Sequence, residues 1–334
     1  MSSLPTDDLR TSRLAVLAAV MESDAGLAFD IVSGLMAEGV SFESVLFAIV
    51  APLQTEMGRR WQQGDVGISE EHASTGAVET LVALLAGSLS QPDDGDHVVV
   101  ACAEGDNHSL PARMIAAYLL YLGYRVTFLG TSVPASDLGG YLEEMKPQAV
   151  VLSCAMATNL PGARRSIQAA HESGVPVLAG GRGFGDGSRA TLIGADAWAA
   201  TPQELAALLG SWQPRPDLAE AAAQGQNEES AQLEVDAPRV FADARDNATM
   251  ILGDAVRGRV AADMWVMVKA LVASVMTDDA EIMREYAAWH SQMRAATHGS
   301  AETTPIILSA LHDAVAERSP TAAAHLDHAI ATLD

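Results

Sequence analysis

Apolar residues recur at every third or fourth position in four stretches between residues 8 and 90. The third stretch follows Ser41 and shows the pattern most clearly, with apolar residues at Val45, Ile49, Leu53, Met57 and Trp61. Gly39 precedes this stretch, Gln62-Gln63-Gly64 follows it, and Ser69 opens the fourth stretch. Breaks this short between amphipathic helices predict an antiparallel four-helix bundle over residues 1–90.

The hydrophobic pattern changes after the turn sequence Gln91-Pro-Asp-Asp-Gly. Short β-branched runs then alternate with helical patterns. The runs are residues 97–103, 124–130, 149–154, 176–181 and 195–199. The helical patterns between and after them cover residues 110–122, 135–145, 160–173 and the stretch from Thr201. Strands that alternate with helices predict a flavodoxin-like, doubly wound parallel sheet over residues 91–212.

Residues 213–238 have the composition of a linker. Pro214, Pro216 and Pro238 bracket a polar stretch that shows no apolar period. From residue 239 to residue 334 the helical pattern returns in five segments without any strand pattern. The chain is therefore expected to be a multidomain α and α/β protein that ends in an all-α, globin-like bundle.

Composition and charge exclude several classes of protein. Hydrophobic residues make up 49% of the 334, so the chain can form buried cores, and its net charge of −23 opposes direct binding of nucleic acid or anionic membranes. The two cysteines, Cys102 and Cys154, form no C-x-x-C pair, so neither a disulfide framework nor a zinc site is expected. The N-terminus does not resemble a secretion signal, and apolar stretches such as Leu81–Ala86 are too short to span a bilayer. We expect a cytoplasmic protein.

Three features fall at the carboxyl ends of predicted strands, which is the edge where open α/β sheets bind ligands. Asp106-x-His108 follows the first strand, Ser153 ends the third, and Gly180-Gly181 ends the fourth. A histidine with a carboxylate two residues away can bind a metal through one ring nitrogen while the carboxylate holds the other. Adjacent glycines let a ligand approach the backbone closely. Together they predict a site for a bulky, metal-containing ligand.

This combination resembles a known signature. The chain contains Asp106-x-His108-x-x-Pro111, then Ser153-x-Ala155 after 41 residues, then Gly180-Gly181 after 24 more. This order and spacing are similar to the D-x-H-x-x-G, S-x-L, G-G pattern of cobalamin-binding domains. The resemblance implies that His108 is the lower axial ligand of cobalt and that Asp106 is its hydrogen-bond partner. It further implies that Ser153, Gly180 and Gly181 surround the displaced benzimidazole tail.

Two positions depart from that pattern, because Pro111 replaces its glycine and Ala155 replaces its leucine. We expect Ser109 to be the N-cap of the next helix and to contact the cofactor. Pro111 would then lie in the first helical turn, where a missing N–H is tolerated. Proline is bulkier than glycine, so the path of the tail depends on this position.

A second pattern, Trp61-x9-Glu71-His72, joins the end of one predicted helix of the first bundle to the start of the next. Trp61 can be a core aromatic residue, and Glu71 can complement the helix dipole. Next to a cobalamin-binding domain, however, the pattern resembles the adenosylcobalamin photoreceptors of the CarH type. The resemblance implies that Trp61 packs over the upper adenosyl group and that Glu71 and His72 line the same pocket. After light, a second histidine of this helical cap could reach cobalt.

The C-terminal helices allow two interpretations. They can form a dimerisation or relay module, or they can hold a second pigment, since the order of modules resembles that of the photocobilins. The second interpretation implies a bilin such as biliverdin. Because neither cysteine lies in residues 239–334, that bilin would be bound without a thioether. The candidate residues of its pocket are Arg284, Tyr286, Trp289 and His290.

The sequence thus predicts a non-enzymatic photoreceptor that uses adenosylcobalamin and, in the second interpretation, biliverdin. We expect a homodimer or homotetramer with a separate downstream signalling partner. Two alternatives stay open. One is a corrinoid protein that carries methyl groups for a methyltransferase, and the other is a regulator that senses cobalamin without light.

Overall fold

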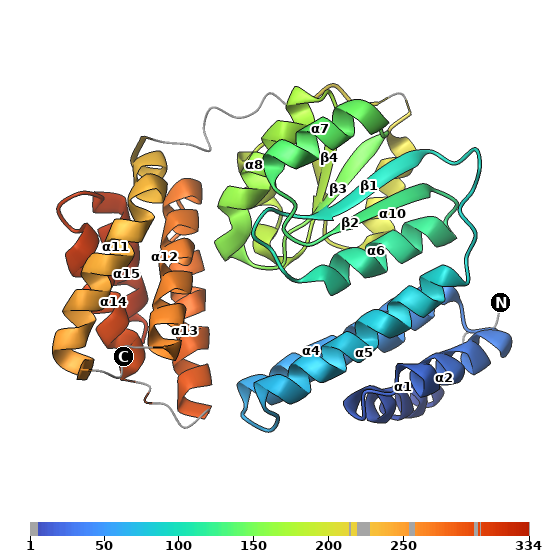
Figure 1. Cartoon of the computed structure of the whole chain (residues 1–334), viewed down its shortest axis with the longest axis horizontal. Coiled ribbons are helices and arrows are strands. Elements are labelled where there is room, and N and C mark those ends of the chain that lie inside the picture. Colours follow the sequence, from blue (N-terminus) through green and yellow to red (C-terminus); the bar gives the residue numbers. More distant parts are fainter. Residues whose placement is uncertain are drawn as a thin grey trace.

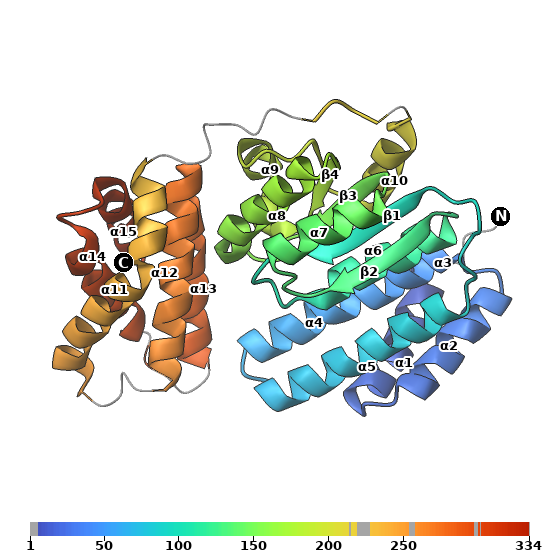
Figure 2. The same cartoon turned by 45° about the horizontal axis from the view of Figure 1, so that its top comes forward.

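Three groups of elements make up the molecule (Figures 1 and 2). The computed structural model describes residues 6–213, 215–218, 228–253, 258–296, 300 and 302–333. In Figure 1 a helical cap lies below a parallel sheet, and a C-terminal bundle stands to their left. The cap packs on the sheet domain through contacts between helices α5 and α6, and α12 of the C-terminal bundle packs on the sheet domain.

The cap consists of the four expected helices. The first two helices are α1 (Thr6–Met21) and α2 (Ala25–Ala37), and the fourth is α5 (Ile68–Gly87). The third helix is continuous and consists of α3 (Phe42–Ser44), η1 (Val45–Val50) and α4 (Ala51–Gln62). Ser41 caps the third helix by accepting a hydrogen bond from the N–H of Ser44 at 3.1 Å. The fourth helix begins at Ile68 instead of Ser69, because the N–H of Gly67 donates to the Glu70 carboxylate at 2.7 Å and closes the first turn. The pattern of apolar residues did not reveal that η1 is a π-helix.

All five predicted strands form one parallel sheet in the order β2-β1-β3-β4-β5, which confirms the flavodoxin-like fold. The strands are β1 (His97–Cys102), β2 (Arg125–Gly130), β3 (Ala149–Ser153), β4 (Val177–Gly180) and β5 (Ala197–Ala199). The helices are α6 (Ser109–Tyr121), α7 (Ala135–Met145), α8 (Leu160–Glu172), α9 (Ser188–Leu192) and α10 (Pro202–Ser211), with short 3-10 turns η2 (Ala157–Asn159) and η3 (Arg182–Phe184). The five-residue α9 follows the glycine-rich run after β4, where no helix was expected.

Alternate residues of the central strands face opposite layers of helices. Val98 and Val100 pack with residues of α6 and α10, whereas Val99 packs with residues of α7 and α8. The connections after β1 and β3 therefore leave toward opposite faces of the sheet. Neighbouring strands whose connections diverge create a crevice at their carboxyl ends, and in this order of strands it lies between β1 and β3.

The C-terminal bundle contains the five predicted helices, but the first begins earlier than expected. The helices are α11 (Glu228–Leu252), α12 (Arg259–Thr277), α13 (Glu281–Ala296), α14 (Thr303–Val315) and α15 (Pro320–Ala331). The linker expected over residues 213–238 is wrong in its second part, because α11 starts at Glu228 and runs through Pro238. Leu233, Ala237 and Val240 recur at helical spacing and are buried, which explains why this stretch folds onto the bundle.

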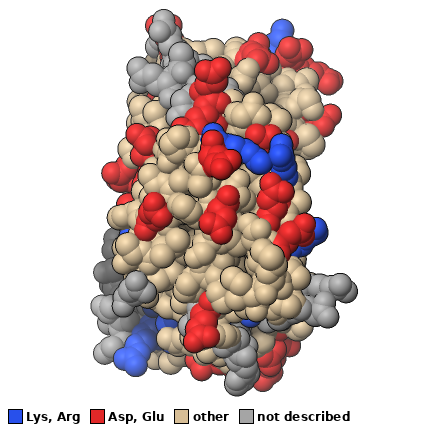
Figure 3. All heavy atoms as spheres, turned by 90° about the vertical axis from the view of Figure 1, so that its left-hand side faces the viewer, with Lys and Arg blue, Asp and Glu red and all other residues tan. Residues whose placement is uncertain are grey.

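Helix α12 is the central helix of this bundle. Residues Val260–Thr277 have a mean hydropathy of 1.6 and are long and apolar enough to cross a membrane. The expectation that the apolar stretches of the chain are too short to span a bilayer therefore does not hold for this helix. In the structure 67% of this segment is buried inside the protein, as in the core helix of a bundle. The outer face of the bundle shows many acidic and few basic side chains (Figure 3), in keeping with the net charge of −23.

Candidate functional site

The turn after β1 holds Asp106 inside the protein. The N–H of Ala103 donates to the carbonyl of Ser153 at 2.8 Å and extends the pairing of β1 with β3. Gly105 then adopts a φ of +83°, and the N–H of Asp106 donates back to the carbonyl of Ala103 at 2.9 Å. Glycine suits this tight turn because positive φ is costly for other residues. The Asp106 side chain thereby enters the crevice between the two strands, where it is fully buried.

The Asp106 carboxylate accepts three hydrogen bonds. One oxygen lies 2.7 Å from Nδ1 of His108 and 3.0 Å from the backbone nitrogen of the same residue. The other oxygen accepts the N–H of Ala155 at 2.6 Å. Burial raises the pKa of Asp106, but the hydrogen bonds from His108 and Ala155 outweigh it, so the net pKa is below the ordinary value. Asp106 therefore remains a carboxylate that joins the loop after β1 to the loop after β3.

His108 presents its other ring nitrogen outward. The hydrogen bond to Asp106 raises the pKa of His108, and burial only partly opposes this. More than half of the imidazole is exposed, at 56%, and among the described residues no hydrogen bond involves Nε2. The carboxylate keeps the neutral ring's proton on Nδ1, so the Nε2 lone pair is available to a metal.

His108, with Asp106 as its hydrogen-bond partner, suits a metal ion that is already bound by ligands from outside the protein. Within the part of the chain that the structure describes, no group of three or more His, Cys, Asp or Glu side chains could hold a metal ion. A bare cation needs several protein ligands. A corrinoid would bring its cobalt already bound within its own ring, so one histidine supported by one carboxylate would be enough to hold it.

The ends of β3 and β4 supply a surface with little side-chain bulk. Ser153 is 8% exposed, and no hydrogen-bond partner of its hydroxyl lies among the described residues. Gly181 has a φ of +108°, and a Cβ there would lie 2.4 Å from the carbonyl oxygen of Cys154, so only glycine fits. At Gly180 a Cβ would meet only a carbonyl oxygen 3.8 Å away, so its missing side chain leaves room above the strand end.

Helix α6 begins one residue earlier than expected. Its N-cap position is His108, and Ser109 is the first helical residue instead of the cap. The Ser109 hydroxyl is instead hydrogen bonded to the Glu79 carboxylate of the cap. Pro111 still lies in the first turn, where its missing N–H would have no intrahelical acceptor, so the proline that replaces the glycine of the pattern is compatible with this helix.

The cap places Glu71 and His72 at the start of α5. Thr75 donates a hydrogen bond to Glu71 at 2.8 Å, and Nδ1 of His72 lies 2.6 Å from the other carboxylate oxygen. Helix α5 lies against the start of α6, where Glu79 is hydrogen bonded to Ser109 next to His108, and the Glu71 charge also helps to raise the pKa of His108. His72 is the only histidine in residues 1–90, a point available from the sequence that singles it out among cap residues.

Trp61, at the end of α4, contacts the C-terminal bundle. Its ring centroid lies 5.9 Å from that of Trp289 on α13, and Trp289 in turn lies 5.5 Å from Tyr286. The sequence did not predict that these aromatic residues form one continuous row across two helical units. The row joins one cap candidate to two of the pocket candidates from the C-terminal helices.

The remaining C-terminal candidates have different surroundings. Arg284 pairs with Glu281 on its own helix at 2.6 Å. His290 is fully buried, and its Nδ1 lies 2.9 Å from the hydroxyl of Thr304. Its Nε2 is 3.2 Å from Asp263 Oδ2, but neither atom has a hydrogen bond of acceptable geometry.

The structure adds two residues to this buried group that the sequence analysis missed. Asp263 lies near His290, and Arg294 lies 3.8 Å from the same carboxylate oxygen. The Nε atom of Arg294 is also buried without a hydrogen-bond partner. Both residues were detectable only as charged positions within apolar helices, on α12 and α13.

A second His–Asp pair lies at the opposite end of the sheet. Nε2 of His171 is 2.8 Å from Asp196, whose carboxylate also accepts the N–H of Val177 at 2.6 Å. The His171 side chain, at the end of α8, is only 10% exposed. This pair stabilises the amino ends of β4 and β5 and is not part of the candidate site.

Comparison with known proteins agrees with this geometry. Residues 96–225 match the model of a B12 binding domain, and residues 14–86 match a second model of the same description. The HTH-type transcriptional repressor CarH of Myxococcus xanthus is 31% identical over 176 residues, which cover 51% of this chain and 58% of that protein. The trimethylamine corrinoid protein of Methanosarcina barkeri is 24% identical over 161 residues, which cover 47% of this chain and 74% of that protein.

The two family models extend over the cap and the sheet domain. A second repressor of Myxococcus xanthus, HTH-type CarA, is 29% identical over 111 residues, which cover 33% of this chain and 37% of that protein. The chain thus spans little more than half of one repressor and about a third of the other. Through its two B12 binding domains the chain is a cobalamin-binding protein with homology to the CarH-type regulators.

Proposed function

We propose that this protein is a cytoplasmic, non-enzymatic light sensor that binds adenosylcobalamin between the cap and the carboxyl edge of the sheet. When bound, this cofactor supplies a cobalt–carbon bond that visible light can cleave. The observation that carries the proposal is the contact between α5, the helix that holds Glu71 and His72, and the start of α6. The Ser109 hydroxyl next to His108 is hydrogen bonded to Glu79 of α5, and the Glu71 charge helps to raise the pKa of His108, which supports one site formed by the cap and the sheet edge.

In this proposal the sheet edge holds the cofactor. Asp106 keeps the His108 proton on Nδ1 and directs Nε2 outward, which orients the imidazole before any ligand arrives. The Ser153 hydroxyl is available to the nucleotide tail, and Gly180 leaves room for it. The hydrogen bond from Ala155 fixes Asp106, so the site is organised by the fold instead of by the ligand.

The cap would respond to the state of the upper ligand. His72, with Nδ1 held by Glu71, has the same arrangement as His108 with Asp106, so its Nε2 is the cap's candidate for a second imidazole at cobalt. Trp61 contacts Trp289, so a shift of the cap would reach α13 directly. We propose that the output is a change in the assembly of a homodimer or homotetramer, which a separate signalling partner detects.

A second pigment is supported by one specific observation. Among the described residues, Asp263 Oδ2, His290 Nε2 and Arg294 Nε are buried without a hydrogen bond, although the Asp263 oxygen lies within ion-pair distance of both His290 and Arg294. These groups keep hydrogen-bonding capacity that a ligand could use. The pyrrole N–H groups and propionates of a bilin offer matching donors and acceptors, and Tyr286 and Trp289 lie next to this group. We propose non-covalent biliverdin as that ligand, with the arginine partner at Arg294 instead of Arg284.

Absorption spectroscopy tests the light-sensing proposal. Protein produced with biliverdin and loaded with adenosylcobalamin in the dark should show a lasting change in its cobalamin bands after green light. His108→Ala should lose the spectrum of histidine-bound cobalt while remaining folded, and Trp61→Ala should bind cobalamin with less preference for the adenosyl form. A red-absorbing band that co-purifies would show the bilin, and its absence would make the C-terminal bundle a relay.

The alternative functions predict different results. A methyl carrier, as the relationship to a trimethylamine corrinoid protein suggests, would turn over methylcobalamin with a methyltransferase and tolerate the loss of Trp61. A light-independent cobalamin sensor would bind the adenosyl and hydroxo forms equally and show no change on illumination. Either result would refute the light-sensing proposal.

A further inference from the structure

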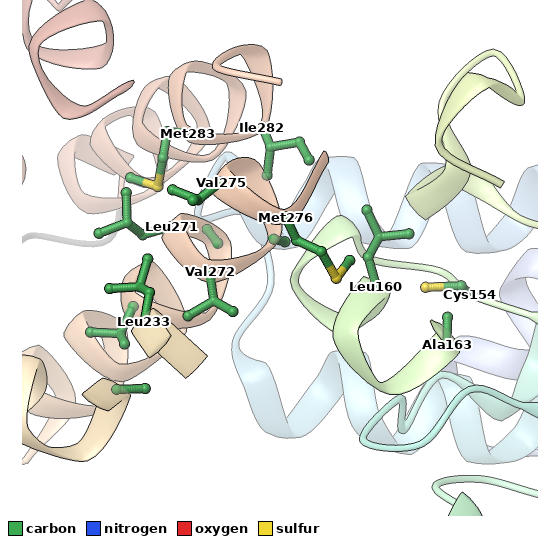
Figure 4. Packing of buried hydrophobic residues seen from close by; sticks show 14 of the residues in the cluster. Cys154, Leu160, Ala163, Leu233, Leu271, Val272, Val275, Met276, Ile282 and Met283 are labelled. Atoms are coloured by element: carbon green, nitrogen blue, oxygen red, sulfur yellow. The ribbon is translucent and has the colours of Figure 1, made fainter. Parts of the chain in front are cut away.

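The C-terminal bundle is attached to the rest of the molecule at two ends. At one end, Met276 of α12 packs against the sheet domain in the same buried cluster as Leu160 and Cys154 (Figure 4). Arg189 of the sheet domain also pairs with Asp279, just after α12, at 2.7 Å. The side chains of this ion pair are 12% and 28% exposed, so the contact is largely shielded from water.

At the other end, α13 lies against the end of α4 in the cap. Besides the Trp61–Trp289 contact, Gln62 donates a hydrogen bond to Gln292 at 3.2 Å. A Cβ added at Gly64 would lie 2.8 Å from the carbonyl oxygen of Ala296, so the two backbones approach closely. Packing at both ends fixes the part of the bundle that lies between them.

Lys269 is on α12 between these two attachments. It shares one face of the helix with Val272 and Met276, because residues three and seven positions apart lie on the same side. Seven residues correspond to about 10 Å along a helix, so Lys269 is displaced by that distance from the Met276 contact toward the cap. Helix α12 also contacts η2 (Ala157–Asn159), the turn that follows β3 and Ala155, so α12 runs along the edge of the sheet that holds Asp106 and His108.

The ammonium group of Lys269 has no partner of its own. Among the described residues it forms no ion pair and no hydrogen bond, although the chain carries 43 acidic residues. It is half-buried and is one of only two lysines in the sequence. Its nitrogen is not among the buried polar atoms that lack a partner, so the ammonium group is in contact with water and can exchange that water for an acceptor oxygen of a bound ligand.

We infer that the C-terminal bundle completes the cobalamin site, and that Lys269 donates a charged hydrogen bond to an acceptor oxygen at the rim of the bound corrinoid. Two groups of cobalamin offer this chemistry. The amide side chains of the corrin ring carry carbonyl oxygens, and the nucleotide tail carries a phosphodiester. The inference depends on the cobalamin site at His108 and not on light sensing.

The test is a titration in the dark with hydroxocobalamin, using the full chain. Lys269→Met keeps the length of the side chain and removes the charge, and it should raise the dissociation constant about tenfold or more, the usual effect of losing a charged hydrogen bond. Lys269→Arg should recover most of the affinity. Lys146→Met is the matched control, since the chain's other lysine precedes β3 at the amino end of the sheet and should have no effect.

Two further comparisons complete the design. Lys269→Gln serves as a second neutral variant in case Lys269→Met does not fold, with thermal unfolding as the check. Diaquocobinamide, which lacks the phosphodiester, identifies the acceptor: an equal loss for both ligands indicates a ring amide, and a loss for cobalamin alone indicates the phosphate. Folded neutral variants that bind hydroxocobalamin as tightly as the unmodified protein would overturn the inference. An unchanged cobalt spectrum in His108→Ala would instead refute the assignment of the site.

Discussion

Replacing Asp106 by asparagine is expected to release His108 without changing the size of the side chain. The carboxylate accepts hydrogen bonds from His108 Nδ1 at 2.7 Å, from the His108 backbone at 3.0 Å and from Ala155 at 2.6 Å. An asparagine amide offers one accepting oxygen and one donating nitrogen. In either orientation, the nitrogen faces at least one N–H group, so at least one of the three hydrogen bonds is lost.

The size of the effect follows from these contacts. Loss of a carboxylate that orients a metal-bound histidine typically weakens metal binding by about 10- to 100-fold. That range corresponds to about 1.4 to 2.7 kcal/mol of binding free energy. A buried N–H left facing another donor adds about 1 to 3 kcal/mol of destabilisation to the folded protein. We therefore expect Asp106→Asn to bind cobalamin more weakly and to unfold at a lower temperature.

Two measurements separate these effects, and Asp196→Asn is the matched control. Asp196 has a similar arrangement, with a histidine at 2.8 Å and a backbone N–H at 2.6 Å, but it lies at the opposite end of the sheet. Absorption titration with hydroxocobalamin gives the affinity, and thermal unfolding of the ligand-free protein gives the stability. Both variants should be less stable, but only Asp106→Asn should lose affinity. Equal affinities for the two variants would refute the role of Asp106 in orienting His108.

Three further predictions concern other positions. Gly181→Ala should destabilise the sheet domain by more than about 1 kcal/mol, because its φ is +108° and a Cβ would lie 2.4 Å from the carbonyl oxygen of Cys154. Gly180→Ala should keep the unfolding temperature of the protein and lower only its affinity for cobalamin. Glu229 accepts hydrogen bonds at the start of α15, and these lower its pKa below 4.5 although burial acts in the opposite direction. The stability that Glu229 contributes is therefore present above that pH and is lost as the pH falls further. Glu229→Gln should cost about 1 kcal/mol at neutral pH and reduce the acid dependence of thermal unfolding. Burial raises the pKa of Cys102 to about 12 and also raises that of Cys154, so neither thiol should react with a thiol reagent at mildly alkaline pH until urea unfolds the chain.

Features that depend on short stretches of sequence were predictable. The strand β1 and the Asp106-x-His108 pair follow each other directly, so the alternation of strands and helices already places the histidine at the binding edge of the sheet. Gly180 and Gly181 were predicted to let a ligand approach the backbone, whereas at Gly181 the structure shows the carbonyl of Cys154 in the place of a Cβ. The local pattern is informative here because these constraints lie within a few residues or on neighbouring strands.

Contacts between distant segments could not be predicted in the same way. Trp61 and Trp289 are far apart in the sequence, and no periodicity indicates that their helices meet. The start of α11 was also missed, since Pro238 suggested a linker whereas the burial of Leu233 outweighs the cost of proline inside the helix. Lys269 resembles any polar residue on an apolar helix until the position of His108 is known.

The π-helix of the cap lets its third helix hold one residue more than a regular α-helix of the same number of turns. Each residue of an α-helix turns the chain by about 100°, and a π-helical segment accommodates one additional residue without breaking the helix. Residues Val45–Val50 form this segment, upstream of α4 and of Trp61 at its end. The wider turn absorbs that residue, so deleting one residue within Val45–Val50 would restore a regular α-helix and leave Trp61 directed toward Trp289. Deleting one residue within α4, before Trp61, would instead rotate Trp61 by about 100° away from Trp289. The third helix of the cap can therefore tolerate a change of length in its π-helical turn but not in α4.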